Sequence, residues 1–162
     1  MEGGCHLGVK KRKRTWKSKP KEDWTITDWE GWLWPTFSQY IRLRDCIKTT
    51  GTVSHGRCTT CSKIYPIEKS QAGHFVPGRT RAILFDEDCV NLQCYRCNIK
   101  LSGNWPKYYR WMQKNHGQEK IEQLVDLYGV DRELTPEWFK QSYTYYEWCV
   151  SEMRRTGALV ED

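Results

Sequence analysis

The sequence contains no apolar run close to the roughly 20 residues that a bilayer-spanning helix requires. Its first residues carry no apolar core of the kind found in signal peptides. Internal repeats are absent as well, so a repeat architecture is not expected. We therefore expect a soluble, cytoplasmic protein that has no membrane partner.

Aromatic and charged residues, by contrast, are plentiful. The 162-residue chain contains nine Trp and nine Tyr, and 28% of its residues are charged. A chain of this length suits one domain with a modest hydrophobic core, which a bound metal ion would supplement.

Two cysteine pairs with CxxC spacing lie in the middle of the chain. Cys58 and Cys61 form the first pair, and Cys94 and Cys97 form the second. Each short turn can supply two thiolates to one ion, so the spacing predicts a tetrahedral structural Zn²⁺ site that is closed to substrate. The remaining cysteines show no ligand spacing and are expected to be small buried or incidental thiols: Cys5, Cys46, Cys89 and Cys149.

Positive charge is concentrated near the N-terminus of a chain whose net charge is +6. Nothing apolar there could offset the entropy cost of folding, so residues 1–23 are expected to form a disordered arm. This arm either keeps the protein soluble or contacts DNA phosphates, in which case the contacts come from Lys10, Lys11, Arg12, Lys13 and Arg14.

Residues 24–50 are expected to hold a Trp-rich capping segment and a helix. The Trp-rich part would pack on the domain, although its rings could also stack on bases. The helix is predicted to begin at Pro35 or Thr36 and to end near Lys48, because apolar residues recur there at helical spacing.

The rest of the chain divides into a cysteine-containing core and a helical region. Residues 51–105 are predicted to contain a hairpin over 62–76 and a short helix from Cys94 to Leu101. Residues 106–162 are predicted to be helical, at about 106–115, 118–128 and 135–155. Together these patterns predict an α+β fold.

One stretch of the core resembles the phage NinG (Rap) recombination proteins and, more distantly, phage endonuclease VII. The resemblance covers about residues 35–130. It is carried by Gly73-His74-Phe75 and by the run from Phe85 through Cys94-Tyr95-Arg96-Cys97-Asn98 to Asn104. It implies a small zinc-stabilised ββα-metal core of the HNH, treble-clef kind, with flanking helices.

The resemblance also implies roles for individual residues. His74 would be the general base that deprotonates water, since a neutral imidazole accepts a proton near pH 7. Asn98 would bind a catalytic Mg²⁺ or Mn²⁺, because four thiolates leave zinc no open position. Asn91 would orient His74. Phosphates of the DNA would be clamped by Arg79, Arg81, Arg96 and Lys100.

Each role has a plainer alternative. His74 could be a buried, hydrogen-bonded side chain or a further zinc ligand, and Asn98 could cap a helix. The basic residues could be ordinary surface charges. Gly73 stands where many HNH nucleases have an acidic metal ligand, and Asp86 or Asp88 could replace it.

The implied function is metal-dependent endonuclease cleavage of branched recombination intermediates, such as Holliday junctions and D-loops, in the host-cell cytoplasm. Two other functions stay open: a non-catalytic zinc module that binds DNA and recruits a recombination partner, and a sequence-specific HNH nuclease. The expected partners are branched DNA, recombination proteins and a second copy of the chain, which would dimerise through the long C-terminal helix.

Overall fold

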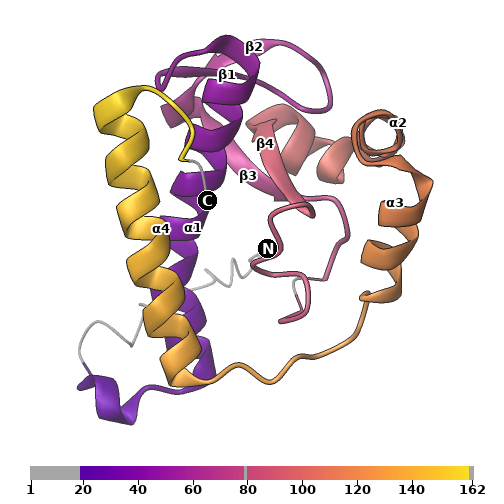
Figure 1. The fold of residues 1–162 in the computed structure, drawn as a ribbon. Helices are drawn as coiled ribbons and strands as arrows, with labels where there is room; N and C mark the ends of the chain where they lie inside the picture. The colour runs from indigo at the N-terminus through magenta and orange to yellow at the C-terminus, as the bar shows by residue number, and fades with distance from the viewer. Residues whose placement is uncertain (1–18, 79, 161–162) are drawn as a thin grey trace, which may run out of the picture.

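The fold is seen in a computed structural model, which describes residues 19–78 and 80–160. The described chain combines helices with two small antiparallel sheets, so the predicted α+β class is confirmed (Figure 1). Several residues named above lie outside the described residues: Cys5, Lys10, Lys11, Arg12, Lys13, Arg14 and Arg79.

Helix α1 (Ile26–Thr50) begins earlier than the sequence indicated. Thr25 and Asp28 form a capping box, in which the Asp28 N–H donates to Thr25 Oγ1 and the Thr25 N–H donates to Asp28 Oδ2. Most of the Trp-rich segment therefore belongs to the first turns of α1, and the predicted start at Pro35 or Thr36 was wrong. Pro35 is tolerated inside the helix because burial of neighbouring rings offsets its lost hydrogen bond.

Helix α4 (Pro136–Thr156) lies beside α1 and runs in the same direction (Figure 1). The pairing follows from three ring contacts, Trp29 with Phe139, Trp32 with Tyr143, and Phe37 with Tyr146. The predicted bounds of α4 are confirmed, with Thr135 as N-cap and Gly157 just beyond its end. Much of the aromatic content of the sequence is therefore used to join the first long helix to the last.

The strands form two separate two-stranded sheets. β1 (His55–Arg57) pairs with β2 (Ile64–Pro66), whereas β3 (Ser70–His74) pairs with β4 (Val90–Cys94). The single hairpin predicted over 62–76 was therefore wrong. The short helix η3 (Ile67–Lys69) separates β2 from β3, and the partner of β3 is the fully buried β4.

Short elements connect the cysteine region to the remaining helices. η2 (Lys21–Asp23) precedes α1. After β4, the chain forms a single π-helical turn, η4 (Arg96–Lys100), and then η5 (Ser102–Asn104). Two more helices follow near their predicted positions, α2 (Trp105–Asn115) and α3 (Gly117–Asp126). No helix in the described part of the chain is both long enough and apolar enough to cross a membrane.

The main hydrophobic core is shared by α1, α4, α2 and the β3–β4 sheet. Cys89 and Cys149 are fully buried within this core, and Cys46 is fully buried as well. The prediction that these three are buried thiols is confirmed.

Candidate functional site

The four cysteines of the CxxC pairs come together in one cluster. Cys58 and Cys61 lie on the turn between β1 and β2, whereas Cys94 ends β4 and Cys97 lies in η4. Their Sγ atoms all lie within 4.8 Å of one another, and the Cys61–Cys94 pair is 3.9 Å apart. A tetrahedral site with Zn–S bonds of about 2.3 Å places its sulfurs about 3.8 Å apart. The cluster therefore fits a zinc-type metal ion.

Neighbouring groups adjust these thiols for metal binding. Burial would raise the pKa of Cys58, but hydrogen bonds with the Thr60 hydroxyl and the Cys94 N–H lower it to about 7. A metal ligand must be a thiolate, so these hydrogen bonds favour the form of Cys58 that binds a metal ion. Asn104 Nδ2 donates to Cys97 Sγ at 3.5 Å. Asn104 thus contacts the cluster from the short helix η5.

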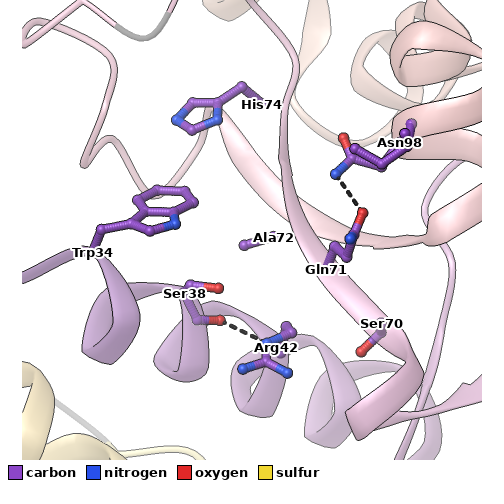
Figure 2. Close-up of a pocket in the computed structure, with 9 residues that line it drawn as sticks. Trp34, Ser38, Arg42, Ser70, Gln71, Ala72, His74 and Asn98 are labelled. Carbon is purple, nitrogen blue, oxygen red and sulfur yellow. Dashed lines mark hydrogen bonds between the residues drawn. The ribbon is translucent and has the colours of Figure 1, made fainter. Parts of the chain in front are cut away.

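A pocket lies at the edge of β3 that carries no strand partner in the described structure. It measures about 430 Å³ and is shown in Figure 2. Helix α1 contributes one wall through side chains four residues apart. The pocket is lined by Trp34, Ser38, Arg42, Ser70, Gln71, Ala72, His74, Asn98 and Ile99. Two residues predicted from the sequence, His74 and Asn98, therefore line the same pocket.

The His74 ring is held on two sides. Its Nε2 lies 3.1 Å from the carbonyl oxygen of Leu84, and the ring stacks on Trp34 with centroids 5.3 Å apart and planes 17° apart (Figure 2). A carbonyl oxygen only accepts, so the neutral ring carries its proton on Nε2. Nδ1 therefore holds the lone pair that a general base uses.

Asn98 reaches the pocket from the opposite face of β3. Its Nδ2 donates to Gln71 Oε1 at 2.9 Å, and its Oδ1 points toward Gly73. Successive residues of a strand point to opposite faces, which places His74 on the α1 side and Gly73 on the Asn98 side. The two functional candidates consequently approach the β3 edge from both faces instead of facing each other.

A side chain at position 73 would collide with two neighbouring side chains. A Cβ there would lie 2.2 Å from Gln93 Oε1 and 2.9 Å from Asn98 Oδ1. Asp86 and Asp88 do not supply an acidic side chain here, because neither lines the pocket. Asp86 accepts from the Cys89 N–H, and Asp88 pairs with Lys120.

Gln93 occupies the space beside Gly73. Its side chain is fully buried, and Nε2 donates to the Gly103 carbonyl at 2.8 Å. Gln93 Oε1 is one of two buried side-chain polar atoms in residues 19–78 and 80–160 that lack a hydrogen-bond partner. Leaving such an oxygen unsatisfied costs on the order of 1–3 kcal/mol.

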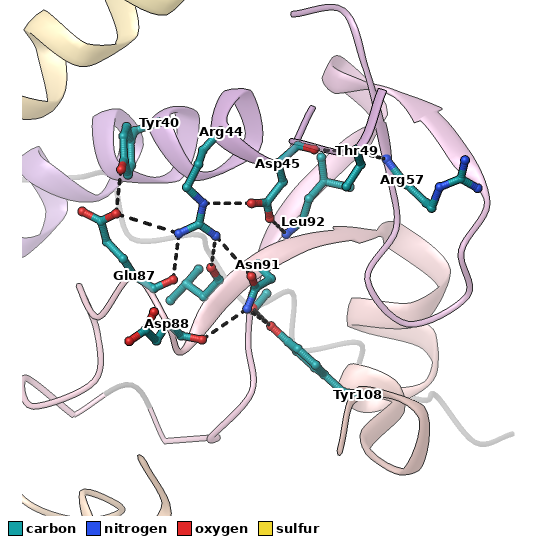
Figure 3. Close-up of polar contacts among 12 residues, drawn as sticks. Tyr40, Arg44, Asp45, Thr49, Arg57, Glu87, Asp88, Asn91, Leu92 and Tyr108 are labelled. Carbon is teal, nitrogen blue, oxygen red and sulfur yellow. Dashed lines mark hydrogen bonds and ion pairs between the residues drawn. The ribbon is translucent and has the colours of Figure 1, made fainter. Parts of the chain in front are cut away.

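A buried polar network contacts β3 and β4 (Figure 3). Arg44 donates to Asp45, to the Glu87 and Val90 carbonyls, and to Asn91 Oδ1. Burial lowers the pKa of Arg44, but the Asp45 carboxylate outweighs it and holds this pKa above its usual value. Arg44 therefore stays charged and ties α1 to the sheet.

Asn91 belongs to this network. Its Nδ2 donates to the Asp88 carbonyl at 3.3 Å and to the Tyr108 hydroxyl at 3.1 Å, and that hydroxyl donates to the Gly73 carbonyl at 2.9 Å. The Asn91 amide therefore acts on the backbone next to His74 through Tyr108, instead of on the ring itself. Sequence reasoning missed Tyr108 because α2 gives no local sign of what it faces.

The predicted phosphate-binding cations differ in their surroundings. Arg81 is already engaged by Glu30 at 2.8 Å and Asp131 at 2.6 Å. Arg96 and Lys100, in contrast, are exposed on η4 beside Asn98. Arg81 is therefore a structural ion-pair residue, and the other two remain available to a polyanion.

Arg42 is a pocket cation that the sequence analysis missed. Its guanidinium donates to the Ser38 and Ile67 carbonyls, both at 3.1 Å, and these bonds hold it in the pocket wall (Figure 2). Burial lowers its pKa from a high ordinary value, so it stays protonated. The spacing of Trp34, Ser38 and Arg42 was a usable signal, because residues four apart share one helix face.

These features define the class of protein: an α+β protein whose small sheets carry a four-cysteine cluster able to hold a zinc-type metal ion. A family model described as Bacteriophage Lambda NinG protein matches residues 7–155. The chain therefore belongs to the NinG family. Neither a curated protein nor a solved structure gave a match to the chain.

Proposed function

We propose that this protein is a metal-dependent endonuclease that cuts branched DNA formed during phage recombination. The observation that carries the proposal is that His74 and Asn98 line one pocket next to the cysteine cluster. In this proposal, the antiparallel β3–β4 pair and the helical turn η4, joined at the cysteines, would form the three elements of a ββα-metal site. Membership of the NinG family supports a recombination-related role.

The pocket residues suit attack on a phosphodiester. His74 would take a proton from water through Nδ1, while the Leu84 carbonyl and Trp34 hold the ring. Arg42 would contact a non-bridging phosphate oxygen. A divalent cation bound at Asn98 would stabilise the negative charge that develops on the phosphate. The zinc-type ion would keep η4 against the sheet.

DNA binding is proposed on the basis of charge and shape. Within the described residues, the pocket lies at the edge of β3 that has no strand partner, and a sugar–phosphate backbone would bind along this edge. Exposed Arg96 and Lys100 lie on η4, the element that also carries Asn98. A polyanion that follows the edge would therefore meet positive charge on the side of η4.

A second candidate is a non-catalytic zinc module that binds DNA and recruits another recombination protein. Gly73 favours it, since no carboxylate occupies the usual position for a metal ligand. A sequence-specific HNH nuclease is the third candidate, and it differs from the first in its substrate.

The test incubates purified, zinc-loaded protein with a four-way junction and with linear duplex, in Mg²⁺ or Mn²⁺. Wild type should cut the junction, and His74→Ala should still bind it but cut it about 10²- to 10⁴-fold more slowly. His55→Ala is the matched control, because His55 is exposed on β1, outside the pocket, and bonds to Ser54. It should cut like wild type.

The other outcomes assign the alternatives. Junction binding without cleavage in either metal would establish the non-catalytic module. Cleavage of linear duplex at a fixed sequence would establish the sequence-specific nuclease. Equal cleavage by wild type and His74→Ala would remove His74 from the mechanism.

A further inference from the structure

We propose that Gln93 Oε1 and Asn98 Oδ1 together bind the divalent cation, so that Gln93 replaces the acidic ligand that Gly73 cannot provide. This inference deepens the proposed nuclease function and rests on it for the role of the ion. It assigns a ligand role to a residue that the sequence analysis did not single out.

The two oxygens converge on one point. Both lie within 3 Å of the place where a Cβ of residue 73 would stand, Gln93 Oε1 at 2.2 Å and Asn98 Oδ1 at 2.9 Å. They come from different elements, β4 and η4, and meet over the same face of β3. The absence of a side chain at Gly73 is what allows them to approach.

The orientation of the Gln93 amide is determined by its other end. Nε2 donates to the Gly103 carbonyl at 2.8 Å and to Thr60 Oγ1 at 3.3 Å. The Gly103 carbonyl only accepts, so a flipped amide would place two acceptors against each other. Oε1 must therefore point toward Gly73 and Asn98, where it has no hydrogen-bond partner within the described residues.

Thr60 lies between the first two cluster cysteines and Gly103 lies just after η4, so both anchors belong to the segments that the cysteines hold. Zinc-type binding would thus position Gln93 as well as Asn98.

The chemistry of the donors indicates the kind of ion. Mg²⁺ and Mn²⁺ prefer oxygen ligands, and Mg²⁺ keeps several waters while using few protein groups. Two neutral amide oxygens bind a cation more weakly than a carboxylate does, because they add no negative charge. The ion should therefore bind weakly to the free protein and more tightly when a DNA phosphate supplies the charge.

The experiment measures Mn²⁺ binding directly, by electron paramagnetic resonance of zinc-loaded protein with and without an uncleavable phosphorothioate junction. Gln93→Met keeps the side-chain length but removes the oxygen, and should weaken Mn²⁺ binding about tenfold or more, since partners behind a metal ligand alone contribute about 10- to 100-fold. Gln123→Met is the control, because Gln123 is exposed on α3 and bonds only to Glu119.

Two further variants distinguish the loss of a metal ligand from misfolding of the protein. Gly73→Asp should clash with Gln93 in the wild-type background. Gly73→Asp combined with Gln93→Ala removes the 2.2 Å contact and leaves the 2.9 Å contact with Asn98 Oδ1, which a small rotation of the Asn98 side chain relieves. The backbone of Gly73 lies outside the left-handed region, so Asp is permitted there. The double variant should regain the Mn²⁺ affinity that Gln93→Ala loses. Zinc content is measured for every variant to verify the fold.

The results separate this inference from the proposed function. Wild-type Mn²⁺ affinity in folded Gln93→Met, or no Mn²⁺ site in wild type even with DNA, would overturn the inference, and junction cutting by wild type would leave the nuclease intact. A Gln93-dependent Mn²⁺ site in a protein that never cuts a junction would instead keep the ion site and remove the nuclease. Failure of the double variant to recover binding would also count against Gln93 as ligand.

Discussion

The cysteine cluster and the His74 pocket share the same segment of chain, yet they are assembled differently. Each cysteine pair comes from one short turn, and the two turns meet where β4 lies against the β1–β2 connection. The pocket instead takes its walls from α1, β3 and η4, and its support from α2 and from the network around Arg44.

This difference indicates how stability and function are divided. Each half of the cluster is a local turn, and a bound ion would join the two turns. The pocket needs the long helices to be in place, because Trp34 and Arg42 reach His74 only when α1 has docked. The following variants test this division, beginning with the largest expected effect.

Loss of the cluster should affect both regions. Cys97→Ser should lose the zinc-type ion and unfold the β1–β2 and β4–η4 segments, because structural zinc contributes apparent binding free energies of about 10–16 kcal/mol in small domains. Metal analysis and thermal unfolding followed by circular dichroism measure this. Cys149→Ser is the control: that thiol is buried in the main hydrophobic core, which is separate from the cluster of the four cysteines, so the metal should stay. An unchanged metal content in Cys97→Ser would contradict the assignment.

Loss of the buried network should affect the sheets without removing the metal. Arg44→Met leaves the Asp45 carboxylate buried and without its cation, which costs about 3–5 kcal/mol. Urea denaturation measures the change. Arg42→Met, two positions away on α1, should change the free energy of unfolding far less, because Arg42 lines the pocket and has no acidic partner among the described ion pairs. Similar losses in both variants would refute the separation.

Tyr108 connects the network to the pocket. Tyr108→Phe leaves the buried Gly73 carbonyl without its 2.9 Å hydrogen bond and should cost about 1–3 kcal/mol. Hydrogen exchange of the β3 amides should also become faster, since the backbone next to His74 loses a support. Tyr109→Phe is the matched control for Tyr108→Phe, because the Tyr109 hydroxyl donates only to the exposed Gln118. It should leave both measurements nearly unchanged.

The smallest effect is expected at the surface of the pocket. If DNA follows the β3 edge, Arg96→Ala should weaken junction binding a few-fold and lower the slope of log K against log salt by about 0.9. Arg81→Ala should leave that slope unchanged, because Glu30 and Asp131 already neutralise Arg81. Fluorescence anisotropy over a range of salt concentrations distinguishes the two arginines. Equal slopes for both variants would place the DNA elsewhere.

Much of the architecture was accessible from local sequence signals. Thr135 and Pro136 mark the start of α4 because capping and a fixed φ act within one turn. The capping box of Thr25 and Asp28 was an equally local signal, but the prediction placed the start of the helix at Pro35 or Thr36 and missed it. The pairing of β3 with β4 was not accessible, because strand partners are chosen by burial over long sequence separations.

The sequence by itself determined the cysteine cluster, since a CxxC turn places two thiolates correctly whatever surrounds it. It also marked His74 and Asn98 by their positions relative to those cysteines. Only the tertiary structure decided that Arg42 enters the pocket, that Arg81 is neutralised, and that Gln93 fills the space beside Gly73. Those contacts join residues distant in sequence, and close packing of α1, β3, β4 and η4 determines which side chains meet.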